Sequence, residues 1–231
     1  MYELYVGNKN YSSWSLRPWI LMRELGITFA ERWVPFGDTP KWDSYRRIAP
    51  NGKVPCLIDA GTAVWDSLAI IEYLSERHGG VWPDDREART WARSAAAEMH
   101  SGFTELRSRC PMSCGVRVRL AGVPPALGRD LERIGALWND GLRRFGGPFL
   151  TGRTFTAADA FFTPIAFRIQ TYGLRLDTVA AQYAARLLAR PAMREWYVHG
   201  LDERIRDEPH DAEVRGAGTV IADLRRPSGA A

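Results

Sequence analysis

The spacing of hydrophobic and polar positions changes near residue 80, and this change divides the chain into two parts. Before it, short apolar runs alternate with one-sided helical patterns; after it, nearly every segment has helical spacing. Alternating strands and helices are typical of an α/β domain, and successive helices are typical of an all-α domain. The elements expected in the first part are a strand at 2–6, a helix at 17–25, a strand at 28–36, a short helix at 42–48, a hairpin of 54–59 and 62–65, and a helix at 66–80.

The second part is expected to consist of helices separated by prolines and glycines. Residues 81–87 contain Pro83 and three acidic side chains, a composition typical of a linker. Residues 210–231 are rich in glycine, alanine and arginine, so we expect a loose tail there. Helices are expected at 88–109, 124–145, 155–172, 177–189 and 192–205. The predicted units are an α/β domain at 1–80, a linker at 81–87, an all-helical domain at 88–209 and a tail at 210–231.

Composition excludes several classes of protein. Hydrophobic residues make up 45% of the 231 positions, which is enough for a packed core and unlike a disordered chain. No apolar run is long enough to cross a membrane, so we expect no membrane partner. The first ten residues lack the basic-then-apolar pattern of a signal peptide. A cytoplasmic location is the resulting expectation.

The charged residues and cysteines indicate neither nucleic-acid binding nor a metal site. The net charge of +4 comes from 31 basic and 27 acidic residues that are interleaved along the chain, so no nucleic-acid partner is expected. Cys56, Cys110 and Cys114 are odd in number and form no CxxC pair. This pattern argues against a disulfide framework and against a zinc site, and we expect no metal.

Proline at the start of a predicted strand is a candidate peptide-binding feature. In "NGKVPCLID", Pro55 cannot donate a ladder hydrogen bond and belongs at a sheet edge or a strand start. A cis Val54–Pro55 bond would expose the Val54 N–H and C=O groups together, and that pair could hold a peptide backbone as an added strand. A trans bond would make this only an ordinary strand start.

A second candidate feature is the start of the helix predicted at 66–80. Asp66 or Ser67 could be its N-cap, and the free N–H groups of the turn would attract an anion. The Ser67 hydroxyl could donate to a ligand carboxylate and Asp66 could accept from an ammonium group. An α-amino acid carries both groups on one carbon and would fit. The alternative is that both residues only cap the helix.

These features together resemble the cytosolic glutathione transferase superfamily. The most specific segments are "NGKVPCLID", "WDSLAIIEYLSE" and "TGRTFTAADAFFTPI", and the resemblance extends to about residue 205. It implies a thioredoxin-like α/β domain followed by an all-α helical-bundle domain. It also implies glutathione as co-substrate, a role in detoxification and a homodimer. In the third segment, Thr156 and Asp159 have the spacing of a capping box, and the resemblance gives this pair a structural role.

The segment "NYSSWSLRPW" is most similar to the serine-type classes, the zeta class in particular. The resemblance places the thiol-activating hydroxyl at Ser12, with Ser13 second and Tyr11 third. We expect Ser15 to be the helix N-cap, because Pro18 then lies in the first turn. Trp14 stands where the zeta class has a cysteine. This replacement argues against thiol–disulfide chemistry at the turn and against maleylacetoacetate isomerisation.

The resemblance also places the two ends of the substrate site. Lys53 lies where relatives contact the glycine end of glutathione, although a solvent-facing lysine is the alternative. His100, Phe103 and Arg107 share one helix face and could line an electrophile pocket together with Tyr11 and Trp14. The alternative makes Phe103 a core residue and His100 an interface histidine. Weaker pocket candidates are Arg168 and Tyr172.

The function predicted from the sequence is glutathione transfer. A serine hydroxyl would activate the glutathione thiol for attack on a small aromatic or anionic electrophile. Two alternatives stay open. One is an isomerase, dehalogenase or ether-cleaving enzyme with the same site, and the other is a non-catalytic glutathione-transferase-like binding protein.

Overall fold

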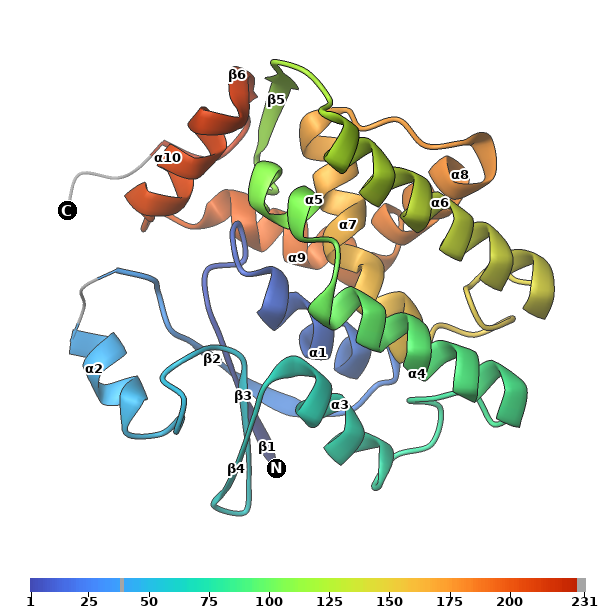
Figure 1. Ribbon diagram of the computed structural model, residues 1–231. Coiled ribbons are helices and arrows are strands. Elements are labelled where there is room, and N and C mark those ends of the chain that lie inside the picture. The colour runs from blue at the N-terminus through green and yellow to red at the C-terminus, as the bar shows by residue number, and fades with distance from the viewer. Residues whose placement is uncertain (38–39, 228–231) are drawn as a thin grey trace.

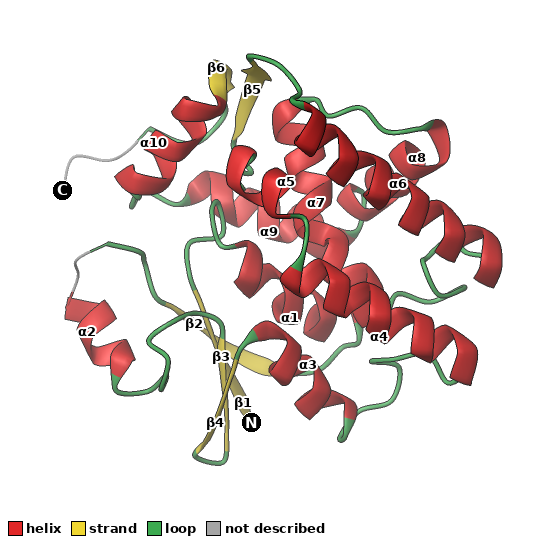
Figure 2. Cartoon of the chain, in the orientation of Figure 1, coloured by secondary structure: helices red, strands yellow, loops and turns green. Residues whose placement is uncertain are grey.

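The fold is given by a computed structural model that describes residues 1–37 and 40–227, without the side chains of residues 40–42. Figure 1 shows a small sheet with its helices in the N-terminal part and a larger group of helices packed beside it. Strands occur in two places among the described residues, in the sheet and in a separate pair (Figure 2).

The N-terminal part is a four-stranded mixed sheet with the order β2-β1-β3-β4. Strand β1 pairs in parallel with β2 and antiparallel with β3, and β3 and β4 form a hairpin. This is the thioredoxin-like arrangement that the alternation of elements predicts. The elements are β1 (Tyr2–Val6), α1 (Ser13–Glu24), β2 (Phe29–Trp33), α2 (Pro40–Arg46), β3 (Cys56–Asp59), β4 (Thr62–Trp65) and α3 (Ser67–Ser75).

The C-terminal part is mainly helical, as expected. Helix α7 lies at its centre, is buried along nearly its whole length and packs against α1, α4 and α8. The elements are α4 (Arg86–Ser101), α5 (Thr104–Arg109), β5 (Val116–Leu120), α6 (Pro125–Phe145), α7 (Ala157–Tyr172), α8 (Thr178–Leu188), α9 (Pro191–Asp202), α10 (Glu208–Ala217) and β6 (Gly218–Asp223).

The long helix predicted at 88–109 is broken into α4 and α5. Gly102 is extended at the end of α4, where a Cβ atom would lie 2.7 Å from the Glu98 carbonyl oxygen. Phe103 follows with a left-handed backbone (φ 54°) and a buried ring. Burial of this ring compensates for a conformation that a non-glycine residue rarely adopts. The break separates His100 on α4 from Arg107 on α5.

The expectation of a loose tail at 210–231 is wrong for the residues that the structure describes. Residues 208–217 form α10, and β6 pairs antiparallel with β5, about a hundred residues earlier in the chain. Local composition cannot predict such a strand, because its partner is distant in the sequence. Residues 228–231 lie outside the described part.

The segment predicted as a linker is partly packed. Val81 and Trp82 are buried, and the Val81 carbonyl accepts a hydrogen bond from the Ala157 N–H at 2.8 Å. Helix α4 then begins at Arg86, one residue before the predicted linker ends. The connection therefore ties the first residue of α7 to the N-terminal part.

The capping box at the start of α7 is confirmed. The Asp159 carboxylate accepts from the Thr156 N–H at 2.9 Å, from the Leu150 N–H at 3.0 Å and from the Tyr183 hydroxyl at 2.7 Å. All of these groups are buried, and burial raises the pKa of Asp159. One carboxylate thus satisfies donors from three segments.

Replacing Asp159 with alanine should lower the free energy of unfolding by about 3 kcal/mol or more, because three buried donors lose their acceptor. Denaturant unfolding followed by circular dichroism measures this change. Asp84→Ala is the control. Because Asp84 is exposed, its substitution should change the free energy of unfolding by less than about 0.5 kcal/mol. Equal stability of the two variants would contradict a structural role for Asp159.

Candidate active site

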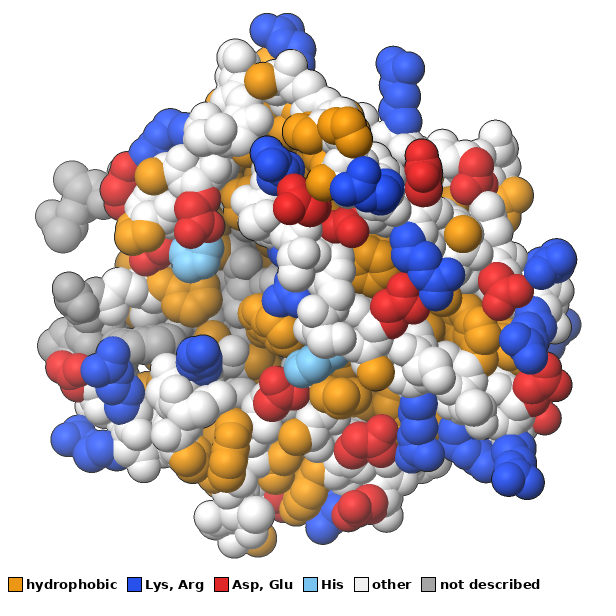
Figure 3. Space-filling view, viewed as in Figure 1, with side chains coloured by type: hydrophobic (Ala, Val, Ile, Leu, Met, Phe, Trp, Pro, Cys, Tyr) orange, Lys and Arg blue, Asp and Glu red, His pale blue; other side chains and the backbone are white. Residues whose placement is uncertain are grey.

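A cavity of about 760 Å³ opens between the two parts of the chain. It faces the viewer in Figure 3, where acidic and basic side chains are interspersed over the surface. Clefts between domains are preferred ligand sites. The cavity is lined by Tyr11, Ser12, Ser13, Trp14, Phe36, Lys53, Val54, Thr104, Arg107, Ser108, Pro111, Met112, Arg168, His210 and Glu213.

Helix α1 begins earlier than predicted, and Ser12 is its N-cap. The Ser12 Oγ accepts from the Ser15 N–H at 3.3 Å and lies 2.8 Å from the Ser15 Oγ. The Ser15 Oγ in turn accepts from the Gly7 N–H at 3.2 Å. The expectation that Ser15 caps the helix is therefore wrong. Pro18 lies inside the helix, where it leaves one helical hydrogen bond unmade.

The three candidate hydroxyls differ in their partners. Within the described part of the chain, the Ser13 side chain makes no hydrogen bond, and it borders the cavity. Ser12 is engaged as the cap. The Tyr11 hydroxyl donates to Asp211 at 3.0 Å and accepts from Arg225 at 3.1 Å. Burial, with Asp211 beside it, raises the pKa of Tyr11 to about 12, so Tyr11 is the least available of the three.

The Val54–Pro55 peptide bond is cis. Val54 and Lys53 border the cavity, and Pro55 is buried at the start of β3. The Tyr45 hydroxyl donates to the Lys53 carbonyl at 2.6 Å and fixes the backbone on this side. The sheet therefore presents Val54 at the cavity edge, close to the start of α1.

Asp66 and Ser67 stand at the start of α3, as predicted, but they point in different directions. Asp66 is the N-cap, with the Leu68 N–H donating to its carboxylate at 2.7 Å, and its side chain is 40% exposed. Its φ of 74° is strained for a non-glycine residue, and such strain gathers at functional sites. Ser67 is fully buried, and its hydroxyl accepts from Arg17 at 3.3 Å. Neither residue lines the 760 Å³ cavity.

Trp14 forms the boundary between the cavity and the start of α3. Its indole lies between two guanidinium groups, 4.1 Å from Arg17 and 4.6 Å from Arg107. His100 packs edge-on against the indole, and its Nε2 is 3.5 Å from the Asp66 carboxylate. Burial lowers the pKa of His100, Asp66 opposes this, and the two arginines lower it further.

The structure does not bring all predicted pocket residues together. Tyr11, Trp14 and Arg107 line the cavity, whereas His100 does not and instead packs behind Trp14 and accepts from Arg107 through its carbonyl. Phe103 is 6% exposed and belongs to the core cluster, in agreement with the alternative interpretation.

Several cavity residues were missed by the sequence analysis. His210 stacks between the rings of Tyr11 and Phe36, at 5.2 and 5.0 Å, and lies in the segment expected to be loose. Glu213 comes from the same helix.

Arg168, a weaker candidate in the sequence, is a buried cavity residue. Its Nε donates to the Cys110 carbonyl at 2.8 Å, and no described carboxylate pairs with it. Burial lowers its pKa to about 10, with Arg107 adding to the effect. With Arg107 and Lys53, it makes the cavity lining mainly positive.

Comparison with known proteins identifies the family. Residues 11–77 match the model of the glutathione S-transferase N-terminal domain. The chain is also 24% identical to the glutathione S-transferase-like protein OpS6 of Beauveria bassiana, over 84% of this chain and 93% of that protein. Residues 11–77 belong to the glutathione S-transferase N-terminal domain family. A probable maleylacetoacetate isomerase of Caenorhabditis elegans is 26% identical over 75% of this chain and 81% of that protein.

Solved structures show a similar fold over most of the chain. A Burkholderia glutathione transferase homologue with bound glutathione has a TM-score of 0.61 and 24% identity, covering 86% of this chain and 97% of that one. A theta class transferase from Xanthomonas axonopodis with glutathione bound has a TM-score of 0.62 and 22% identity, covering 85% and 97%. These structures share the fold of this chain, and the serine-type, zeta-like class stays a prediction.

No described helix of the protein is both long and apolar enough to cross a membrane. The described residues also contain no cluster of three histidine, cysteine or acidic side chains that could hold a metal ion. All three cysteines are buried, and burial raises the pKa of each thiol.

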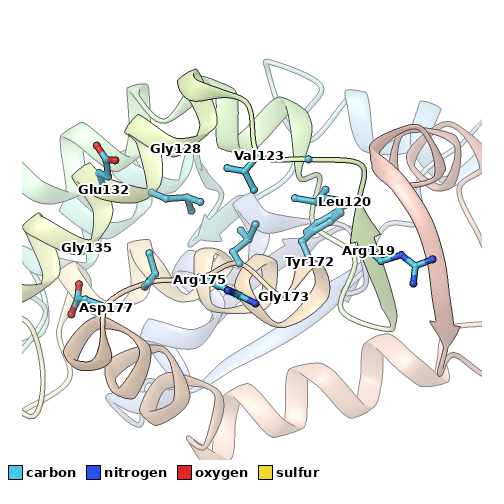
Figure 4. A pocket seen from close by; sticks show the side chains of 14 residues that line it. Arg119, Leu120, Val123, Gly128, Glu132, Gly135, Tyr172, Gly173, Arg175 and Asp177 are labelled. Carbon is cyan, nitrogen blue, oxygen red and sulfur yellow. The ribbon is translucent and has the colours of Figure 1, made fainter.

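A second cavity of about 740 Å³ lies between α6 and the loop that joins α7 to α8 (Figure 4). Its lining is largely apolar, with Leu120, Val123 and Leu131 among the residues. In Figure 4, Arg119 extends away from the other labelled side chains. None of the hydroxyls at the start of α1 reaches this cavity. The cavity between the two parts is therefore the candidate active site.

Glu203 holds the loop that leads into α1. Its carboxylate accepts from the Lys9 N–H at 2.6 Å and from the Asn10 N–H at 3.3 Å. The Trp196 Nε1 donates to the Lys9 carbonyl at 2.8 Å. Burial raises the pKa of Glu203 to about 7, although both N–H groups favour the charged form.

Stability should depend on pH through Glu203. Because folding raises the pKa of Glu203, its contribution to the free energy of unfolding is present below about pH 4.5. That contribution is lost as the pH rises to about 7. Glu203→Gln should remove this pH dependence. The free energy of unfolding of the wild type minus that of the variant should therefore fall by roughly 1–3 kcal/mol from pH 5 to pH 8. Urea unfolding at both pH values measures it. Glu132→Gln, at an exposed site, is the control, and parallel pH profiles for wild type and Glu203→Gln would contradict the assignment.

Proposed function

We propose that this protein is a glutathione transferase that activates the glutathione thiol at the start of α1. The observation that carries the proposal is the convergence of hydroxyls at the α1 N-terminus with cis Val54–Pro55 at one inter-domain cavity. The match of residues 11–77 to the glutathione S-transferase N-terminal domain supports it, as do two structural neighbours described with bound glutathione.

The proposed chemistry begins with the thiol. A free thiol has a pKa near 8.5, so a small fraction is ionised at pH 7. A hydroxyl donor and the positive end of α1 both favour the thiolate. The thiolate then attacks the electrophile and a carbon–sulfur bond forms. The leaving group departs with the bonding electron pair, and the thiol proton passes to solvent.

Ser13 and Ser12 are the proposed hydroxyls. Ser13 is the more available donor, because Ser12 already serves as the N-cap and bonds to Ser15. Ser12 can donate to a thiolate only if its hydroxyl breaks the hydrogen bond to the Ser15 Oγ. The structure therefore favours a role for Ser13 at the sulfur and for Ser12 in holding the turn.

Glutathione would lie along the edge of the N-terminal sheet. In the proposed pose the cysteinyl backbone pairs with the Val54 N–H and C=O groups, and Lys53 faces the glycine carboxylate. The γ-glutamyl end reaches toward α3, where Asp66 can accept from its ammonium group. Pro55, buried behind Val54, holds this edge in place.

The second substrate would be a small anionic, aromatic electrophile. Arg107 and Arg168 offer positive charge on one side of the cavity, while Trp14, Tyr11 and Met112 offer apolar surface. Guanidinium groups suit carboxylates because their donors match both oxygens. A homodimer in the cytoplasm and a role in detoxification complete the proposal.

Glutathione-dependent isomerisation is the second candidate, and the likeness to a probable maleylacetoacetate isomerase favours it. The same thiolate would add to the substrate and leave again. Trp14, in place of the cysteine of that class, counts against it. Product analysis separates the two, since a transferase consumes glutathione and an isomerase returns it.

The serine assignment is tested by Ser13→Ala and Ser12→Ala. Ser13→Ala should reduce kcat for conjugation of chlorodinitrobenzene by roughly 10- to 100-fold, since the thiolate loses its donor, with little change in glutathione affinity. Ser12→Ala should instead lower stability by about 1 kcal/mol through loss of the cap. Steady-state kinetics and thermal unfolding measure both. The reverse result would make Ser12 the activator, and failure to bind immobilised glutathione would overturn the proposed function.

The electrophile class is tested at Arg168. Arg168→Met should raise KM for a chloronitrobenzoate by roughly tenfold or more, because its carboxylate loses a buried cation. The KM for neutral chlorodinitrobenzene should stay nearly unchanged. Arg109→Met is the matched control, because Arg109 is exposed on α5 and pairs with Glu105. Equal effects on both substrates would contradict an anion-binding role.

A further inference from the structure

The imidazole of His210 is held by a buried carboxylate at the edge of the candidate active site. Asp207, the N-cap of α10, is 6% exposed, and its Oδ2 lies 2.5 Å from the His210 Nδ1. An ionised carboxylate only accepts hydrogen bonds, so Nδ1 carries the proton, and the neutral ring has its lone pair on Nε2. Within the described residues, Asp207 forms no other ion pair. Its negative charge is therefore free to stabilise a protonated imidazole.

The exposed part of the imidazole is the edge that carries Nε2. His210 stacks between the rings of Tyr11 and Phe36, with interplanar angles of 26° and 13°, and Asp207 covers Nδ1. The side chain is nevertheless 36% exposed and lines the cavity. In the described part of the chain, Nε2 makes no hydrogen bond. A proton acceptor therefore borders the cavity and is not used by the protein itself.

The imidazole lies between the two features that hold glutathione in the proposed function. On one side, the Phe36 ring and Val54 pack against the same point after β1, because a Cβ atom at Gly7 would lie 2.6 Å from the ring and 3.1 Å from a Val54 methyl group. On the other side, Tyr11 directly precedes the serines at the start of α1. A cysteinyl residue whose backbone pairs with Val54 and whose sulfur meets a serine must therefore pass close to His210.

The stacked rings are fixed without a ligand. Asn8 is fully buried, and its Oδ1 accepts from the Phe36 N–H at 2.7 Å. Its Nδ2 donates to the carbonyl of Ile205, two residues before Asp207, at 3.1 Å. One side chain thus joins the loop that carries Phe36 to the segment that leads into α10. Groups held in this way need no rearrangement when the substrate binds.

The other charged groups near His210 leave Asp207 as its counter-charge. Asp211, the next residue of α10, pairs with Arg225 at 2.6 Å, and both contact the Tyr11 hydroxyl. The other charged side chains that line the cavity are Lys53, Arg107, Arg168 and Glu213. This mainly cationic lining favours a thiolate, while Asp207 favours an imidazolium. Both products of a proton transfer from a thiol to His210 are therefore stabilised.

We propose that His210 is the general base that takes the proton from the glutathione thiol, and that Asp207 orients it. This inference rests on the proposed function, in which glutathione is the co-substrate. The S–H bond breaks, its electron pair stays on sulfur as the thiolate, and its proton binds Nε2. Asp207 stabilises the imidazolium while the thiolate attacks the electrophile. The imidazolium then passes the proton to solvent, which restores the neutral ring.

The fate of the thiol proton tests the inference in the unaltered protein. Calorimetric titration with glutathione in buffers of different ionisation enthalpy counts the protons released, and ultraviolet difference absorbance measures the thiolate formed. Thiolate should form with almost no proton released to the buffer, because His210 retains it. Release of one proton for each thiolate would overturn the inference and leave the proposed function intact. Failure to bind glutathione, or binding without thiolate, would overturn both.

Two variants test the residues themselves. His210→Phe keeps a ring between Tyr11 and Phe36 but removes the base, so kcat/KM for chlorodinitrobenzene should fall by roughly tenfold or more. Its affinity for S-methylglutathione, which has no thiol proton, should stay unchanged. Asp207→Asn can still cap α10 but has no charge to stabilise the imidazolium, so kcat/KM should fall here too. An unchanged kcat/KM in Asp207→Asn would overturn the role given to Asp207.

The matched control is His78→Phe, the same replacement at a histidine that bonds to Tyr2 and does not line the cavity. It should leave kcat/KM unchanged. An unchanged kcat/KM in His210→Phe would overturn the inference. A loss of S-methylglutathione affinity as large as the loss of kcat/KM would assign His210 a structural role and would overturn it as well.

Discussion

The burial of α1 between the sheet and α7 is the constraint on which the rest of the structure depends. Leu16, Trp19 and Ile20 of α1 are completely buried. Each such side chain contributes about 1.5–3 kcal/mol when it leaves water. Because the same helix packs against both parts of the chain, its first turn is fixed at their boundary. A ligand held there must contact both parts, which explains why the cavity is lined from α1, the loop before β3, α5, α7 and α10.

Much of the N-terminal part could be predicted from the sequence because its signals are local. Strand β1, the hairpin and α3 follow from short-range periodicity, and Asp66 follows from its place before an apolar stripe. The start of α1 was placed too late, because the position of Pro18 suggested Ser15 as the cap. In the structure, the serine network of residues 12–15 outweighs one missing helical hydrogen bond.

The rest could not be predicted because it depends on contacts between distant residues. Gly102 and Phe103 break a helix whose polar pattern is continuous, and burial of the Phe103 ring supports the break. Nothing local to Ser67 shows that its hydroxyl turns inward to Arg17, fifty residues earlier. Likewise, Arg168 is buried against the end of α5, where it donates to the Cys110 carbonyl, 58 residues earlier. The residue types of the site were visible in the sequence, while their partners were not.

The pairing of β6 with β5 has a consequence for how the site is completed during synthesis. The Tyr11 side chain is contacted by His210, Asp211 and Arg225, which come late in the sequence. These contacts hold α10 against Tyr11. The ribosome makes the sheet, the start of α1 and the Val54–Pro55 segment more than a hundred residues before it makes α10. A nascent chain can therefore fold its N-terminal part while the cavity still lacks one side. The enclosed site exists only after the segment at 207–226 has been made and has docked.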